Sequence, residues 1–170
     1  MPAPPKPAVD DQAVAFVQTY CGWHIAPELD ETLTLDGPGG WALTLPSLHV
    51  VSIASVTENG TALVEDSDYT WSESGIIRRR CWANDPEVWA PGWWSCEYRS
   101  IVVELTHGYP DWPPELAAVI GTISDRLKDN PTGLEQITVG PFSEKYATGG
   151  AALSAGEHFV LDAYRLPKRS

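Results

Sequence analysis

Apolar residues recur at helical spacing in two well-separated stretches of the chain. Residues 10–22 place them on one wide face, with Asp10 positioned to cap the start and Gly22 to end the helix. Residues 113–128 repeat the pattern from Pro113 onward, where a proline suits the first turn of a helix. The pattern predicts two helices that bury their apolar faces.

A third helix is predicted near the C-terminal end, over residues 154–166. Ser154 and Glu157 stand at the spacing of a capping box, in which each side chain accepts a hydrogen bond from the other residue's backbone N–H. Apolar residues follow until a proline stops the helix. At the other end, residues 1–9 are rich in proline and favour a stiff, extended arm.

Between the first two helices the period of the pattern changes to two. Residues 32–106 contain short alternating runs separated by glycine and proline, which is typical of antiparallel strands. Asn59-Gly60 is a residue pair that favours a tight hairpin turn. We further expect residues 76–82 to run outward and residues 99–106 to run back, as one long hairpin.

Together these elements predict an α+β fold. We expect a small helical bundle of about three helices, with an inserted antiparallel β-sheet that carries the long hairpin, and with the third helix at the C-terminal end. A length of 170 residues suits one domain with a real core, so residues 1–170 are interpreted as a single domain.

The chain is strongly acidic, with 11 Lys and Arg against 23 Asp and Glu, a formal net charge of −12. Such a surface repels nucleic acid, which argues against a DNA-binding role built on phosphate contacts. Two interpretations stay open: an acidic wall along which DNA slides, or acidity that serves solubility. No stretch predicts a membrane span or a secretory signal, so the expected location is the cytoplasm where the chain is made, without a membrane partner.

The sequence has no pattern that predicts catalytic, metal-binding or cofactor-binding residues. Its four histidines show no metal-ligand spacing, and it contains neither a nucleophile elbow nor a phosphate-binding glycine loop. Carboxylates such as Asp30 and Glu31 are expected in turns, as caps and solvating groups. We therefore expect a protein that is not an enzyme and needs no cofactor or metal.

The most unusual feature is a Trp-rich loop at residues 82–95. It holds four of the eight tryptophans of the chain: Trp82, Trp89, Trp93 and Trp94. Because tryptophan buries a large, rigid area, it is enriched at the energetic centres of interfaces. The four are therefore candidate interface residues, with burial of the loop in its own chain as the alternative.

Charged and thiol groups flank this loop. The dense basic cluster Arg78, Arg79 and Arg80 is added to the candidate interface, where it would pair with acidic groups of a neighbour or with carboxylates of its own chain. Cys81 and Cys96 are placed either to face each other across the hairpin or, as is more usual in a reducing cytoplasm, to remain free and buried.

The order of these pieces resembles the head-to-tail adaptor (connector) proteins of tailed bacteriophages of the siphophage type, especially those of actinobacterial phages. The resemblance covers most of the chain. It is carried by FVQTYCGWH (16–24), LTLPSLHVVSIASVTENG (43–60), DYTW (68–71), SGIIR (74–78), VVELTHGY (102–109), PPEL (113–116), VGPFS (139–143) and AYR (163–165).

The resemblance implies a structural role in the neck of a virion. Members of this family form a homo-oligomeric ring, commonly of twelve copies, that binds the portal protein and offers a platform to stopper or tail-terminator proteins. DNA passes through the ring without sequence-specific binding. The family has no catalytic site and needs no cofactor.

The resemblance also implies that the C-terminal segment contacts the portal. The candidate residues are Phe159, Leu161, Tyr164 and Leu166. The stretch 147–153 before them would be flexible and would let the segment become ordered on docking.

Other interpretations stay open beside the adaptor. A stopper or tail-terminator protein works in the same stack of rings. A Trp-rich β-structure is also suited to stack on sugar rings, which makes a carbohydrate-binding module a second class. An enzyme that uses paired carboxylates is the third, and no spacing in the sequence favours it.

Overall fold

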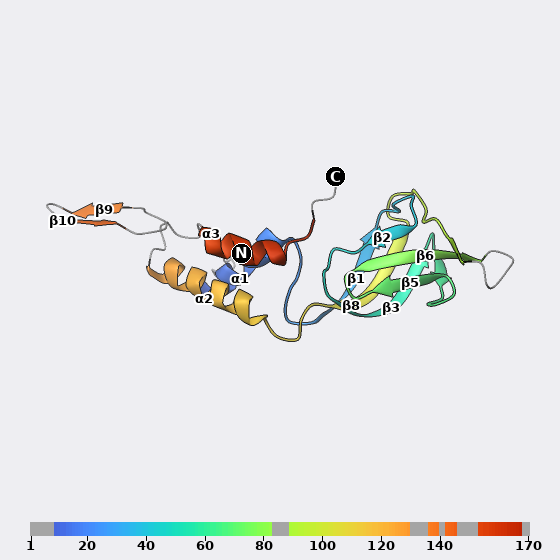
Figure 1. Ribbon diagram of the computed structural model, residues 1–170, viewed down its shortest axis with the longest axis horizontal. Helices are drawn as coiled ribbons and strands as arrows, with labels where there is room; N and C mark the ends of the chain where they lie inside the picture. The colour runs from blue at the N-terminus through green and yellow to red at the C-terminus, as the bar shows by residue number, and fades with distance from the viewer. Residues whose placement is uncertain (1–8, 83–88, 130–135, 140–141, 146–152, 168–170) are drawn as a thin grey trace, which may run out of the picture. The chain divides into compact units, whose positions relative to one another are not determined.

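The computed structural model describes residues 9–82, 89–129, 136–139, 142–145 and 153–167 (Figure 1). The chain divides into two compact units. The helical unit combines Met1–Trp23 with Trp112–Ser170, and the β unit is the continuous stretch His24–Asp111. The predicted α+β class, with three helices and antiparallel sheets, is confirmed.

The helical unit packs its three helices around a small apolar core. The fully buried apolar side chains are Ala13, Val17 and Cys21 from the first helix, Leu116 and Ile123 from the second and Leu161 from the third. A two-stranded antiparallel hairpin precedes the last helix. The elements of the unit are α1 (Val9–Cys21), α2 (Pro114–Asp129), β9 (Gln136–Val139), β10 (Phe142–Lys145) and α3 (Ala155–Ala163).

The helix ends largely follow the local signals of the sequence. Ser154 and Glu157 form the predicted capping box of α3, with both reciprocal hydrogen bonds present. Gly22 ends α1 with a φ of 84°, a conformation that glycine adopts without a Cβ penalty. The prediction of Asp10 as an N-cap is wrong: it lies inside the first turn of α1, where its carboxylate accepts a hydrogen bond from Ser124 of α2.

The third helix is shorter than the predicted 154–166. It ends at Ala163, and the chain then runs extended beside α1, where the N–H of Leu166 donates to the carbonyl oxygen of Cys21 at 2.9 Å. The physical reason is tertiary, because the N–H of Leu166, which a continuing helix would donate to the carbonyl oxygen of Asp162, is instead donated to α1. Among the described residues, no helix is both long and apolar enough to cross a bilayer.

The β unit consists of two antiparallel sheets (Figure 1). One has the order β1-β8-β3-β4, and the other has the order β2-β6-β5 with β7 paired to β6. The first strand begins at Leu29, slightly before the predicted residue 32. The elements are β1 (Leu29–Leu35), β2 (Ala42–Thr44), β3 (Val50–Glu58), β4 (Thr61–Leu63), β5 (Tyr69–Ser72), β6 (Ile76–Trp82), β7 (Trp89–Pro91) and β8 (Ile101–His107).

The two sheets share one apolar core. Strand β8 alternates strictly, so Val103 and Leu105 are buried while Glu104 between them is exposed. From the other sheet, Ile77 of β6 enters the same core. The predicted Asn59-Gly60 turn is confirmed between β3 and β4, with φ values of 50° and 78°.

The expected long hairpin is wrong in its pairing. Strand β6 pairs with β2, β5 and β7, whereas β8 pairs with β1 and β3 in the other sheet. Strand β7 pairs antiparallel with β6, and residues 92–100 then cross to the other sheet. Gly92, directly after β7, permits a close approach to the backbone of β6, because a Cβ there would lie 2.6 Å from the carbonyl oxygen of Arg80.

Candidate interface surfaces

Two adjacent tryptophans of the Trp-rich loop lie in opposite environments. Trp94 is only 2% exposed and belongs to the core that both sheets share, whereas Trp93 is 71% exposed. The N–H of Trp94 donates to the carbonyl oxygen of Gly40 at 2.8 Å and holds the segment against the loop before β2. Trp94 is therefore buried within its own chain, and of this pair only Trp93 has a ring exposed for contact with a partner.

The other two tryptophans of the loop are described only in their backbone. Strands β6 and β7 pair Trp82 with Trp89. The side chains of both lie outside what the structure describes, as does the segment 83–88 between the strands. Their part in an interface stays a prediction.

Arg79 serves its own chain. Its guanidinium lies 5.6 Å from the centre of the Trp94 ring and pairs with the carboxylate of Glu58 at 3.2 Å. It also donates to the backbone carbonyl oxygen of Asp68 at 2.7 Å. The second oxygen of Glu58 accepts from the N–H of Ser95 at 2.7 Å. Arg79 thus joins β6 to the segment after β7. Of the two predicted roles, it therefore has the one in which it pairs with carboxylates of its own chain.

The other two arginines of the cluster differ from Arg79 and from each other. Arg80 donates to the backbone carbonyl oxygen of Asp66, which fixes it to the loop before β5. Arg78 is exposed and holds its guanidinium 4.7 Å from the centre of the Trp41 ring, a cation–π geometry. The dense basic cluster of the sequence is therefore three separate side chains, of which Arg78 is displayed to solvent.

Trp41 was not among the predicted interface residues. It is 47% exposed and follows a glycine-rich turn as an isolated aromatic. Its backbone carbonyl oxygen accepts from the N–H of Arg79 at 3.0 Å, which places it next to β6. The signal that sequence reasoning missed is β-pairing, because Ala42 lies opposite Arg78 and so brings Trp41 beside that arginine.

The outward face of the other sheet is acidic. Asp30 and Glu31 lie in β1 and not in a turn, so that expectation is wrong; pairing with β8 and a polar outer face make this segment a strand. Asp30 accepts from the Thr106 hydroxyl at 2.6 Å, and Glu104 accepts from the Ser55 hydroxyl at 2.9 Å. These carboxylates line a pocket over β1, β8 and β3.

The four candidate residues of the C-terminal segment also differ in exposure. Phe159 is 82% exposed, whereas Leu161 is fully buried. The backbone carbonyl oxygen of Tyr164 accepts from the indole N–H of Trp23 at 2.7 Å. Leu166 is half-buried and bonded to α1 through its backbone. Phe159 is thus the most exposed of the four while α3 is docked, and the side chains of Tyr164 and Leu166 are half-buried. Residues 147–152 of the predicted flexible stretch lie outside the described residues.

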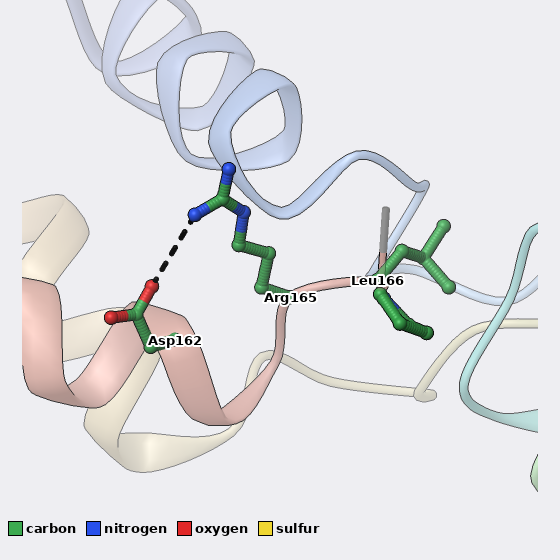
Figure 2. Close-up of a pocket in the computed structure, with 4 residues that line it drawn as sticks. Asp162, Arg165 and Leu166 are labelled. Atoms are coloured by element: carbon green, nitrogen blue, oxygen red, sulfur yellow. Dashed lines mark ion pairs between the residues drawn. The ribbon is translucent and has the colours of Figure 1, made fainter. Parts of the chain in front are cut away.

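A pocket at the end of α3 is lined by Asp162, Arg165, Leu166 and Pro167 (Figure 2). The carboxylate of Asp162 pairs with the Arg165 guanidinium at 3.8 Å, the contact dashed in Figure 2. Asp162 also accepts from the Tyr20 hydroxyl at 2.7 Å, which raises the pKa of Tyr20. The charges of this pocket are already compensated within the chain, and the contacts tie α3 to α1.

Three of the four histidines meet at one end of the β unit. His107 is buried, and its ring lies 6.0 Å from that of His24 and 3.1 Å from the Glu31 carboxylate. Burial lowers the pKa of His107, although Glu31 opposes the shift. His49 stacks on Tyr109 with ring centres 4.3 Å apart. In the described part of the chain, no three His, Cys, Asp or Glu side chains are grouped to hold a metal ion.

Two cysteines are described in full, and both are free thiols. Cys21 is buried, which raises the pKa of its thiol to about 11. Cys96 is exposed, contrary to the expectation of a buried thiol, because it lies in the loop after Trp94. The side chain of Cys81 lies outside the described residues.

Comparison with known proteins identifies the fold. No protein-family model and no curated protein matches the sequence. A chain from the neck of a native gene transfer agent (GTA) particle, computed with C12 symmetry, superposes with a TM-score of 0.59 at 14% identity, over 95% of this chain and 82% of its own. A chain from the neck of an empty GTA particle, computed with C6 symmetry, has a TM-score of 0.56 at 13% identity, over 95% and 78%. At these identities the likeness establishes a shared fold.

Proposed function

We propose that this chain is a structural subunit of the neck of a phage-like particle, where head and tail join. The observation that carries the proposal is the fold, which is shared over 95% of the chain with subunits of GTA necks. The role is that of a scaffold and requires no catalytic residue, metal or cofactor.

In the proposed neck, copies of the chain form a closed ring that extends the DNA channel below the portal. The C12 and C6 symmetries of the similar necks support a ring, and the former supports twelve copies. The net charge of −12 suits a channel wall that repels DNA and leaves it free to slide. The virion neck is then the place of action, with synthesis in the host cytoplasm.

The portal on one side and a stopper or tail-terminator protein on the other are the proposed partners. With α3 docked, the portal contact would use the exposed ring of Phe159. Leu161 is fully buried and would reach a partner only after α3 detaches, whereas Tyr164 and Leu166 are half-buried and are held through backbone hydrogen bonds to Trp23 and Cys21. Such a release is the form that coupled docking would take here.

Light scattering and negative-stain imaging of the purified protein, alone and with the candidate portal, test the proposal. Rings that form alone, or that stack on the portal, support the adaptor role. Rings that ignore the portal but stack on an adaptor ring point to a stopper or tail terminator. A monomer that binds neither the portal nor an adaptor ring would contradict a neck role. A glycan-binding screen would then test the carbohydrate-binding alternative.

A further inference from the structure

The outward face of the sheet β2-β6-β5 carries a cationic and apolar patch. Ile77 points into the core, so Ile76 and Arg78 on either side of it point outward. Ile76 is exposed although it is apolar, and Trp41 beside Arg78 is exposed as well. We call these three residues the Arg78 patch.

The guanidinium of Arg78 is held in place but is not neutralised. Its position over the Trp41 ring restricts the side chain, which lowers the entropy that a partner must remove on binding. Within the described residues, no carboxylate lies at ion-pair distance from Arg78, in contrast to Arg79 with Glu58. In a chain with a net charge of −12, a displayed and uncompensated arginine favours an acidic partner.

The outward face of the sheet β1-β8-β3 offers such an acidic surface. The register places Asp30 opposite Thr106 and Thr32 opposite Glu104, so these four residues share one face. We call them the Glu104 face. Hydroxyl donors orient both carboxylates, and no described Lys or Arg pairs with either. The pocket that lies here has room for a protruding side chain.

The Arg78 patch and the Glu104 face lie on the outer sides of two sheets that share one core. Glu104 lies between Val103 and Leu105, which are buried in the shared core, and Arg78 follows Ile77, which enters that core from the other sheet. One copy of the chain therefore displays a cationic patch on one side of the β unit and an anionic face on the other. Contact between the patch of one copy and the face of the next is heterologous, and such contacts build rings when the rotation closes.

We propose that the Arg78 patch docks on the Glu104 face of a second copy of this chain, and that this contact repeats around the ring. The inference rests on the proposed function, because it names the interface between ring subunits. Arg78 pairs with the carboxylates of Asp30 and Glu104, while Trp41 and Ile76 lose their exposed area to the neighbour.

Charge reversal in the full-length protein tests this contact. R78E and E104R each place like charges against each other, and we expect each variant alone to form rings at least about tenfold less readily than the wild type. An equimolar mixture of the two variants restores an opposite-charge pair between positions 78 and 104 at every interface, because the reversed patch of one meets the reversed position 104 of the other and the two unreversed surfaces also match. Alternating rings should then form at close to wild-type concentrations, as measured by sedimentation velocity and negative stain, with portal added if the wild type requires it.

Matched controls separate this contact from general electrostatics. R99E and E73R reverse exposed charges elsewhere on the β unit and should leave assembly unchanged, as should the mixture of these two. Circular dichroism of all variants verifies the fold. If R78E or E104R assembles like the wild type, or if their mixture assembles no better than each alone, the interface is wrong while the ring stands. If the wild type forms no ring alone or with portal, the proposed function fails, and the interface with it.

Discussion

Each of the two units of the molecule is stabilised internally in a different way. The β unit is continuous in sequence, and its two sheets bury a common apolar core with the ion pair of Arg79 and Glu58 at its edge. The helical unit joins segments from both ends of the chain, and α3 is held there by one fully buried leucine and by polar contacts. The difference teaches that the β unit is suited to a rigid interface, and that α3 is the element most easily detached.

Substitutions at the two adjacent tryptophans should show the largest contrast, and they test the rigidity of the β unit. Trp94→Ala removes a buried ring from the shared core and should cost about 3–5 kcal/mol of unfolding free energy. Trp93→Ala changes an exposed side chain and should cost less than about 0.5 kcal/mol. Urea unfolding followed by circular dichroism measures both, and equal losses would contradict the placement of these residues.

A second substitution tests how α3 is held. Leu161→Ala should cost about 2–5 kcal/mol, because it removes the buried leucine of α3 and leaves a cavity against α1 and α2. Amide hydrogen exchange should then show loss of protection in residues 155–163 before the β unit is affected. The matched control is Phe159→Ala on the exposed side of the same helix, which should leave protection unchanged; a similar loss there would show that Phe159 is not free.

The capping box gives a smaller effect on the same helix. Ser154→Ala removes the side chain that accepts from the N–H of Glu157 and should cost about 1 kcal/mol. Ser154→Asp keeps an acceptor at the cap and should retain most of that stability. Hydrogen exchange in α3 measures both, and equal protection in the two variants would mean that the cap is not what orders the start of the helix.

Acid should affect the two units in different pH ranges, with the smallest effects of this series. Because burial lowers the pKa of His107 from its ordinary 6.5, the unfolded chain binds a proton at pH values where the native ring is still neutral. The stability of the β unit should therefore be full above about pH 6.5 and fall as the pH drops toward the lowered native pKa. A His107→Gln variant should show a flatter profile between pH 7 and pH 5.

Glu157 in the helical unit also loses its contribution to stability in acid, but at lower pH. Burial would raise its pKa, but hydrogen bonds from Ser154 and the Arg126 guanidinium at 2.8 Å outweigh burial and lower it from the ordinary 4.5. Its contribution is therefore present above about pH 4.5 and is lost as the pH falls through the lowered native value. Hydrogen exchange across a pH series should show the β unit weakening first, and α3 losing protection at pH 6 would contradict this assignment.

Local features of the fold were predictable from the sequence, whereas the candidate interface was only partly so. Periodicity and capping signals located all three helices, and the Asn59-Gly60 turn was found from its two residues. The interface prediction grouped residues by neighbourhood in sequence. In extended chain, however, the side chains of neighbouring residues point to opposite sides. Trp93 is therefore exposed while Trp94 is buried, and Arg78 faces solvent while Arg79 pairs within its own chain.

The sequence by itself determined the helices, the tight turn, the strand-rich middle and the acidic charge of this protein, because these depend on backbone preferences and composition over a few residues. Only the tertiary structure decided which strands pair, that Trp94 is buried against the loop of Gly40, and that Arg78 and Glu104 lie on opposite outer faces. The physical reason is that burial and strand pairing are set by residues far apart in sequence. No local pattern records which of several alternating segments will meet.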